Sequence, residues 1–291
     1  MSYNVPLNFD LAGKTAVVTG GGGVLCSGFS KTLAAAGARV AVCDLRLEAA
    51  EKVAEDIRAN GGDAIAVAMN VLDKKSVEEA KDAICKKYDK VDILLNGAGG
   101  NNPKGSTTRD NLTPDEIAEL DANGTIEGVK TFFDLDPDGI SFVFNLNFLG
   151  TLIPTQVFAR DMAKHGGTII NVSSMNAFRP LTRIPAYSGA KAAISNFTQW
   201  LAVHFAPVGI RVNAIAPGFF LTEQNRTLLT NPDGSLTARA DKIIAHTPMS
   251  RFGVPADIDG TLLWLADDRH SAFVDGVVIP VDGGFAAYSG V

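Results

Sequence analysis

The sequence predicts an α/β fold in which helices cover both faces of one doubly wound parallel sheet, of the Rossmann type. Short apolar, β-branched segments alternate with longer segments of helical periodicity along the chain. Several short segments are apolar at consecutive positions, which is typical of strands buried on both faces. Alternating strands and helices favour parallel strands joined by helical crossovers. We expect one domain over residues 1–291, because no repeat, linker or low-complexity tract divides the chain.

Seven segments are predicted strands, and helices are predicted between them. The first helix is expected at about Val24–Ala36, and two more at Leu47–Asn60 and Asp73–Tyr88. A further helix is expected to begin at Asp136-Pro137, where Asp can cap the N-terminus and Pro fits the first turn, and to run toward Lys164. The predicted strands are Lys14–Thr19, Arg39–Cys43, Ala64–Met69, Val91–Leu95, Thr168–Val172, Ile210–Ile215 and Val277–Val281.

Composition, charge and cysteine usage narrow the class of protein. Of the 291 residues, 46% are hydrophobic and 20% are charged, as in ordinary globular domains. The net charge is −6 without a block of Lys or Arg, so we expect no nucleic-acid or membrane-surface partner. No apolar run approaches the roughly 18 residues of a membrane helix, and residues 1–10 lack a signal-peptide pattern. Three sparse cysteines fit a cytoplasmic, reducing compartment, and no metal-ligand spacing is present.

One long polar stretch, Asn101–Phe133, interrupts the alternation of strands and helices. It contains Gly105, Gly124 and Gly128 and a single helical candidate, Pro114–Asp121. A loop of this length in a compact domain is usually a lid or a binding loop. We therefore expect an insertion of about residues 101–133 that closes over a substrate. A solvated surface insertion is the alternative.

The first strand runs into a glycine-rich turn, Gly20–Gly23, before the first predicted helix. Glycines let the backbone approach a pyrophosphate, and the helix N-terminus offers it free N–H groups and a positive dipole end. Asp44 follows the second strand, where a carboxylate can accept hydrogen bonds from the adenosine ribose and repel a 2′-phosphate. The pattern predicts an NAD site rather than an NADP site. A plain tight turn, with Asp44 capping the helix from Leu47, is the alternative, and nearby Arg46 would weaken the preference.

A tyrosine and a lysine four residues apart, Tyr187 and Lys191, lie in a segment that is helical to about Phe205. This spacing places both side chains on one helix face. Tyrosine is a poor acid or base at neutral pH, and a neighbouring ammonium lowers its pKa. Ser174 follows a predicted strand, and its hydroxyl can hold a substrate oxygen beside the phenol. These residues suit carbonyl reduction, in which a proton reaches the oxygen while hydride reaches the carbon.

These motifs together resemble the short-chain dehydrogenase/reductase family over nearly the whole chain. The matching segments are TGGGG (Thr19–Gly23), Asp44, NGAG (Asn96–Gly99), NFLG with Asn147, NVSS with Ser174, YSGAK (Tyr187–Lys191), APG (Ala216–Gly218) and VDGG (Val281–Gly284). The resemblance implies that Tyr187 is the acid/base and that Lys191 lowers its pKa and binds the nicotinamide ribose. It implies that Ser174 orients the carbonyl and that Asn147 holds a water that relays protons. A homotetramer is implied as well.

The same resemblance implies an NAD-binding set, with some departures from the family pattern. The glycine pattern T-G-x-x-x-G-x-G would place its last two glycines at Val24 and Cys26, and Gly23 comes one residue early. Asn70-Val71 stands where the family often has an Asp against the adenine. The implied set is Gly20, Gly22, Gly23, Val24, Leu25, Asp44, Asn70, Val71, Asn96, Ala98, Gly99, Tyr187, Lys191, Pro217, Gly218, Phe220 and Thr222.

A narrower resemblance is to the short-chain type of D-mannonate oxidoreductases, also called fructuronate reductases. It implies interconversion of a secondary alcohol and a ketone on a sugar acid. The candidates for binding its carboxylate and hydroxyls are Arg179, Arg183 and Asn101. Surface charge is the alternative for each arginine. The segments that carry this resemblance are NGAGGNNPK (Asn96–Lys104), TFFDL (Thr131–Leu135), FNLNFLGTLIPTQVF (Phe144–Phe158), FRPLTRIPAYS (Phe178–Ser188) and FFLTEQNR (Phe219–Arg226).

Two other functions are compatible with the same sequence. A gluconate or polyol dehydrogenase, or a 3-oxoacyl thioester reductase, would keep the fold and cofactor and change only the substrate pocket. A non-catalytic NAD-binding regulator would keep the fold alone. The intact set of Tyr187, Lys191, Ser174 and Asn147 argues against the regulator, because such a protein has no physical need for all four.

Overall fold

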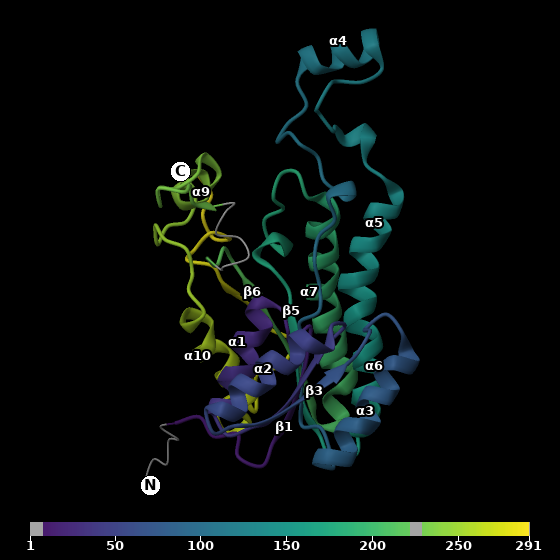
Figure 1. The fold of residues 1–291 in the computed structure, drawn as a ribbon, viewed down its shortest axis with the longest axis vertical. Coiled ribbons are helices and arrows are strands. Elements are labelled where there is room, and N and C mark those ends of the chain that lie inside the picture. The colour runs from purple at the N-terminus through teal and green to yellow at the C-terminus, as the bar shows by residue number, and fades with distance from the viewer. Residues whose placement is uncertain (1–7, 222–228, 291) are drawn as a thin grey trace.

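The computed structural model describes residues 8–221 and 229–290 and confirms the predicted doubly wound α/β fold (Figure 1). Its sheet has seven parallel strands in the order β3-β2-β1-β4-β5-β6-β7. Every predicted strand is present within two residues of its expected ends. The strands are β1 Thr15–Thr19, β2 Arg39–Asp44, β3 Asp63–Ala68, β4 Ile93–Asn96, β5 Gly167–Val172, β6 Ile210–Pro217 and β7 Val278–Val281.

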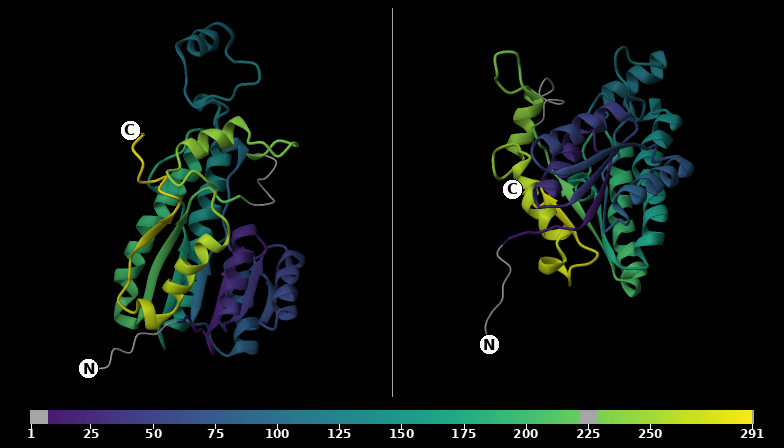
Figure 2. Two further views of the ribbon diagram at one scale, coloured as in Figure 1. Left: turned by 90° about the vertical axis from the view of Figure 1, so that its left-hand side faces the viewer. Right: turned by 60° about the horizontal axis from the view of Figure 1, so that its bottom comes forward.

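Helices cover both faces of this sheet (Figures 1 and 2). The covering helices are α1 Val24–Ala35, α2 Leu47–Ala59, α3 Lys74–Tyr88, α6 Gly150–Met162, α7 Pro185–Phe205 and α10 Ala256–Ala266. Further helices are α5 Pro137–Phe144, α9 Ala238–Ala245 and α11 Asp268–Ser271. On one face, Phe29 of α1 and Leu262 of α10 belong to one buried core. On the other face, Phe158 of α6 and Leu201 of α7 belong to a second. Burial on both faces explains why the strands are apolar at consecutive positions.

The helix predicted from Asp136-Pro137 is one continuous rod in three parts. Asp136 caps α5, because its carboxylate accepts a hydrogen bond from the Asp138 backbone N–H. A π-helical segment, η3 Asn145–Leu149, joins α5 to α6. By length and composition alone, the rod Pro137–Met162 is long and apolar enough to cross a membrane. Half of its most apolar window is buried inside the molecule, as in the core helix of a globular protein.

The insertion forms an arm that projects beyond the start of α5, away from the body (Figures 1 and 2). It begins with the 3-10 turn η1 Pro103–Gly105, carries α4 Pro114–Asn123 at its far end and returns through η2 Phe132–Asp134. The single predicted helix of this stretch is therefore confirmed. The arm does not lie over the sheet, so a lid role stays an expectation that requires the arm to move.

Candidate active site

The predicted site residues gather at the carboxyl ends of the parallel strands. The strand order reverses between β1 and β4, since chain connections lead from β1 toward β3 on one side and from β4 toward β7 on the other. Ligands of open α/β sheets bind in the crevice at this switch point. The glycine turn follows β1, Asn96 ends β4, Ser174 follows β5, and Tyr187 lies in the first turn of α7.

The glycine turn has the shape that a pyrophosphate requires. Gly20 has a φ of +64°, and a Cβ at this position would lie 2.9 Å from the Ala98 Cα. The Gly22 N–H donates to the Asp44 carboxylate at 3.0 Å. Gly23 is the N-cap residue of α1, and no side chain caps the helix. The first-turn N–H groups of α1 are therefore available to an anion, and the turn fits a dinucleotide.

Cys26 stands where the family pattern has a glycine, and Gly97 provides the space for its side chain. The Cys26 side chain is buried, and its Sγ would lie 2.2 Å from a Cβ at Gly97. The thiol therefore occupies space that is open only because residue 97 is glycine. Burial raises the pKa of Cys26 to about 12, so the thiol stays protonated at neutral pH. Sequence reasoning missed Gly97, because the contact joins segments that are far apart in the chain.

Asp44 braces the glycine turn and does not cap α2, whose N-cap residue is Arg46 without a side-chain cap. Its two carboxylate oxygens accept hydrogen bonds from the backbone N–H groups of Gly22 and Arg46, both at 3.0 Å. The Arg46 guanidinium is 4.0 Å away, and its side chain is 75% exposed. Asn70 and Val71, the pair expected beside the adenine, differ in burial. Asn70 is exposed and accepts a hydrogen bond from the Leu72 N–H, whereas Val71 is buried.

Tyr187 and Lys191 lie on one face of α7, as their spacing predicts. The Lys191 Nζ is 5.5 Å from the centroid of the Tyr187 ring and donates a hydrogen bond to the Val172 carbonyl at 2.8 Å. Lys191 is only 4% exposed, and burial lowers its pKa to about 8. A buried amine of this kind is costly, and such groups cluster at functional sites.

The pKa of Tyr187 departs from the expectation. Sequence reasoning expected the neighbouring ammonium to lower it, but burial raises the pKa of Tyr187 above its ordinary value. A hydrogen bond with Ser174 acts in the opposite direction and is the weaker influence. The physical reason is that the Lys191 ammonium is directed at the Val172 carbonyl, so desolvation of the phenol dominates. Ser174 is itself buried and accepts a hydrogen bond from the Asn176 N–H.

Asn147 joins this cluster from the π-helical segment. Its amide donates to the carbonyls of Gly100 at 2.8 Å and Val143 at 2.7 Å. A Cβ at Gly99 would lie 2.6 Å from the Asn147 Oδ1 and 3.2 Å from the Lys191 Nζ, so both polar groups converge on this glycine. Single-turn π segments inside α-helices are frequent at functional sites.

Asn96 lies behind the site and does not line it. It is buried, and its amide donates to the Thr155 hydroxyl at 3.0 Å and to the Asn171 side chain at 2.9 Å. The Asn171 amide continues to the Thr198 hydroxyl at 2.9 Å. This buried polar chain ties β4 and β5 to α6 and α7, so Asn96 supports the sheet beneath the cofactor turn.

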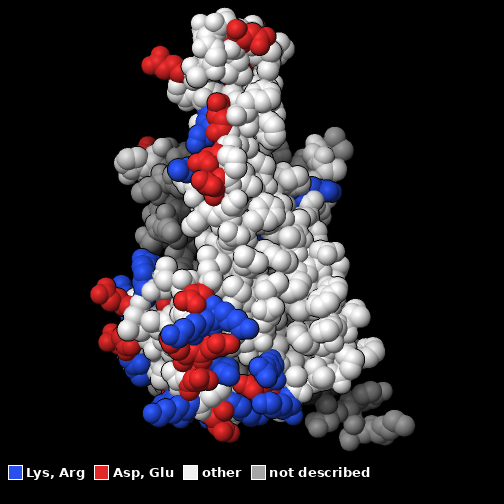
Figure 3. All heavy atoms as spheres, turned by 90° about the vertical axis from the view of Figure 1, so that its right-hand side faces the viewer, with Lys and Arg blue, Asp and Glu red and all other residues white. Residues whose placement is uncertain are grey.

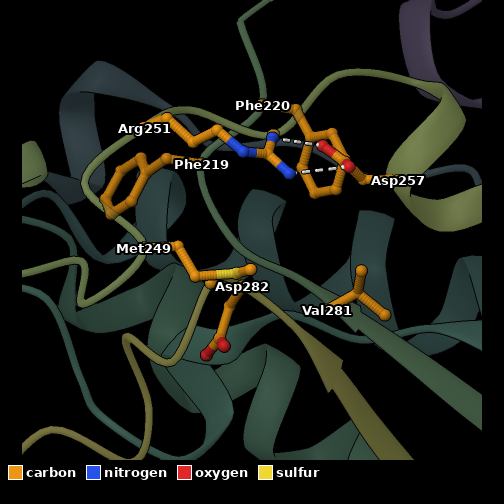
Figure 4. Close-up of a pocket in the computed structure, with 9 residues that line it drawn as sticks. Phe219, Phe220, Met249, Arg251, Asp257, Val281 and Asp282 are labelled. Atoms are coloured by element: carbon orange, nitrogen blue, oxygen red, sulfur yellow. Dashed lines mark hydrogen bonds and ion pairs between the residues drawn. The ribbon is translucent and has the colours of Figure 1, made fainter.

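The segment after β6 lies beside a small cavity of about 210 Å³ (Figure 4). Pro217 ends β6, and a Cβ at Gly218 would lie 2.6 Å from Asp282. The Phe220 side chain is buried and lines the cavity. Figure 4 shows the Arg251 guanidinium paired with both oxygens of Asp257 near it, at 2.6 and 2.8 Å. The predicted contact Thr222 lies outside the described residues.

The three substrate candidates are not gathered into one pocket. The Arg179 side chain is exposed and forms no hydrogen bond or ion pair with the described residues. Arg183 has a φ of +72° and binds the Asp110 carboxylate of the arm at 2.6 Å. Asn101 is exposed, and its amide donates to the Ser106 hydroxyl at 3.1 Å.

Within the described part of the chain, no group of three His, Cys, Asp or Glu side chains could hold a metal ion.

The fold and the residues at the carboxyl ends of its strands define a dinucleotide-binding α/β protein with a partly buried tyrosine beside a buried lysine. A family model described as short chain dehydrogenase matches residues 14–233, and the chain belongs to this family of oxidoreductases. A Haemophilus influenzae protein named only as an uncharacterized oxidoreductase is 57% identical over 291 residues, which are 100% of this chain and 99% of that protein.

Two further relatives carry more specific descriptions. A crystal structure of a candidate D-mannonate oxidoreductase from Haemophilus influenza, with bound NAD, is 55% identical with a TM-score of 0.91. The match covers 98% of this chain and 99% of that one. A 2-dehydro-3-deoxy-D-gluconate 5-dehydrogenase of Dickeya dadantii is 32% identical over 281 residues, covering 96% and 98% of the two chains.

Proposed function

We propose that this protein is an NAD(H)-dependent oxidoreductase that interconverts a secondary alcohol and a ketone on a sugar acid, with D-mannonate and D-fructuronate as the substrate pair. The observation that carries the reaction class is the convergence of Asn147 and Lys191 on Gly99, with Tyr187 on the same face of α7. The two relatives described as acting on sugar acids support the substrate class. The NAD bound to one of them supports the cofactor.

The nicotinamide supplies or accepts the hydride when it is bound. Tyr187 then donates a proton to the carbonyl oxygen during reduction and accepts it during alcohol oxidation. The Ser174 hydroxyl, which hydrogen-bonds to the phenol, positions that oxygen. Lys191, whose Nζ lies 5.5 Å from the centroid of the Tyr187 ring, is expected to hold the nicotinamide ribose beside the phenol when the cofactor is bound. A non-catalytic regulator is disfavoured, because a buried lysine costs stability that binding alone does not require.

Arg179 is the better of the two arginine candidates for the substrate carboxylate. The Arg183 guanidinium is already paired with Asp110, whereas the Arg179 guanidinium has no partner among the described residues. A bidentate pair between guanidinium and carboxylate depends on the fork geometry that lysine lacks.

With D-fructuronate and NADH, Arg179→Ala is expected to raise KM by about 10- to 100-fold, and Arg179→Lys by less, with little change in kcat. Steady-state kinetics measures both. Arg58→Ala removes an exposed arginine at the end of α2 and serves as the matched control. The sugar-acid proposal is wrong if uncharged ketoses are reduced as well as keto acids. Unchanged KM in Arg179→Ala, with activity on keto acids retained, rejects the arginine alone.

Asp44 is expected to set the preference for NAD over NADP. Asp44→Ala removes the negative charge that faces a 2′-phosphate and a brace of Gly22, so the ratio of kcat/KM for NADH to that for NADPH should fall by about tenfold or more. Asp44→Asn separates the two effects, because it keeps an acceptor for the Gly22 N–H and removes only the charge. The cofactor ratio should therefore fall in this variant too. A ratio that is unchanged in both variants would reject this role.

We also infer a homotetramer, which is consistent with the surface over α5, α6 and α7. No charged residue occurs from 139 to 159, and the single Lys or Arg of α7, Lys191, is buried. Figure 3 shows this side of the molecule as a broad uncharged surface, with charged side chains gathered at its lower left and the arm at the top. Trp200 and Val203 are 56% and 80% exposed there. A large exposed apolar patch is typical of a protein interface.

We assign the protein to the cytoplasm, because its three cysteines are free.

A further inference from the structure

The arm is tied to the rest of the molecule near its base. Its outer part is residues 107–131, and its tip is residues 111–128. Two hydrogen bonds, both at 2.9 Å, close the base: the Thr108 N–H donates to the Lys130 carbonyl, and the Lys130 N–H donates to the Thr108 hydroxyl. The Asp110 carboxylate binds Arg183 and the Lys242 ammonium of α9, each at 2.6 Å. These hydrogen bonds hold the pKa of Asp110 well below its ordinary value, so the anchor stays charged at neutral pH.

The tip carries a well-specified helix that contacts almost nothing in its own chain. α4 begins with a capping box between Thr113 and Glu116 and ends at Gly124 in the left-handed conformation. None of its residues is buried. A ten-residue helix without tertiary packing is marginal in water, so both caps stabilise a helix that lacks a packing surface within this chain.

The tip is acidic and partly apolar. Residues 111–128 contain no Lys or Arg, and Leu112 and Ile117 are 40% and 38% exposed. At the foot of the arm, Phe132 and Phe133 are 69% and 66% exposed. A lid with this charge would repel an anionic sugar acid, so closure over the substrate is electrostatically disfavoured. The acidic residues of the tip are Asp115, Glu116, Glu119, Asp121 and Glu127.

We propose that the arm is an intersubunit element whose tip packs on a second copy of this chain. The first argument is continuity. The exposed phenylalanines at the foot of the arm lead directly into α5, where Phe142 and Phe144 are 46% and 37% exposed at the start of the uncharged surface. Figure 3 shows the arm rising from the end of this surface. A copy that covers the surface therefore also comes within reach of the arm.

The second argument is charge complementarity at the opposite end of the same surface. Residues 81–92 of α3 and the loop after it, with residues 160–165 at the end of α6, contain six Lys or Arg and four Asp. Charged side chains gather at that end in Figure 3. Lys86, Lys87 and Arg160 form no ion pair with described residues. Two copies paired antiparallel bring each acidic tip to the basic end of the other, whereas parallel pairing brings two acidic tips together.

Ile117→Asp tests the contact, because it places a charge on the exposed apolar side of α4. The concentration at which the assembly half-dissociates, measured by sedimentation, is expected to rise by about tenfold or more. Leu236→Asp is the matched control, because Leu236 is 37% exposed and lies outside the arm and the uncharged surface. Its assembly should match that of the wild type. Unchanged association in Ile117→Asp, or a wild-type protein that is monomeric at all concentrations, overturns the proposal.

Charge reversal tests the antiparallel arrangement. Glu119→Lys is expected to weaken association, and adding Lys86→Glu and Lys87→Glu is expected to restore it, because each altered tip then meets an altered partner. Loss without restoration overturns this arrangement. Replacing residues 112–125 with a short glycine linker distinguishes an intersubunit role of the arm from a role as a lid over the substrate. Weaker assembly with an unchanged KM supports the intersubunit role. A raised KM with intact assembly overturns it. Neither result depends on which sugar acid is the substrate.

Discussion

Tyr187→Phe is expected to lower kcat by about 10²- to 10⁴-fold while NADH binding is retained. The substitution removes the hydroxyl that donates the proton and keeps a ring of nearly the same volume. The Lys191 ammonium keeps its hydrogen bond to the Val172 carbonyl, so the cofactor side of the cluster should be unchanged. Steady-state rates measure the loss, and titration of NADH fluorescence measures binding.

The pH dependence gives this prediction a second readout. Alcohol oxidation requires the phenolate, and burial raises the pKa of Tyr187, so the oxidation rate should fall as the pH decreases. The residual activity of Tyr187→Phe should lack this dependence. Tyr88→Phe is the matched control and should not affect kcat. The Tyr88 hydroxyl donates a hydrogen bond to Asp63 at 2.8 Å, at the start of β3 and away from the carboxyl ends of the strands. Near-native turnover in Tyr187→Phe would show that another group transfers the proton.

The parts of the fold and site that the sequence predicts are those that depend on local spacing. The seven strands follow from short apolar runs, the turn at Gly20 follows from the glycines themselves, and the shared face of Tyr187 and Lys191 follows from helical periodicity. The capping of α5 by Asp136 is likewise local. Each of these features can be predicted because the interacting residues are neighbours in the chain.

The features that the sequence does not predict depend on distant contacts or on burial. The fit of Cys26 against Gly97 joins helix α1 to the turn after β4, and no propensity of either residue indicates it. Asp110 binds residues 73 and 132 positions later in the chain, which fixes the arm in place. The Tyr187–Lys191 spacing predicts a lowered pKa for Tyr187, but the pKa rises, because desolvation depends on what surrounds the phenol and not on residue spacing.

Lys191→Met is expected to abolish most activity and at the same time to stabilise the fold at neutral pH. Activity should fall because the ammonium that we propose holds the cofactor ribose is lost. Stability should rise because the ammonium is buried, with an exposed fraction of 4%, and its desolvation costs folding free energy. Methionine has a similar length and no charge, so the site stays filled.

The sign and pH range follow from the pKa of Lys191, which burial lowers from 10.5 to about 8. Between these values the unfolded chain binds more protons, so the wild-type free energy of unfolding rises with pH there. Below pH 8 both states are protonated and the penalty is constant, at about 3 kcal/mol. Lys191→Met should therefore melt several degrees higher at pH 7, with a difference that shrinks as the pH approaches 10.5.

Thermal unfolding of both proteins at pH 7 and pH 10, together with kcat at pH 7, tests the prediction. Thr198→Val is the matched control for a polar-to-apolar change inside α7, because it removes a buried hydroxyl that accepts from Asn171 and leaves the ammonium in place. It should lower stability about equally at both pH values. If Lys191→Met is the less stable protein at pH 7, the hydrogen bond from Lys191 to the Val172 carbonyl outweighs the cost of desolvation. The lysine would then stabilise the fold, and its burial would no longer indicate a catalytic role.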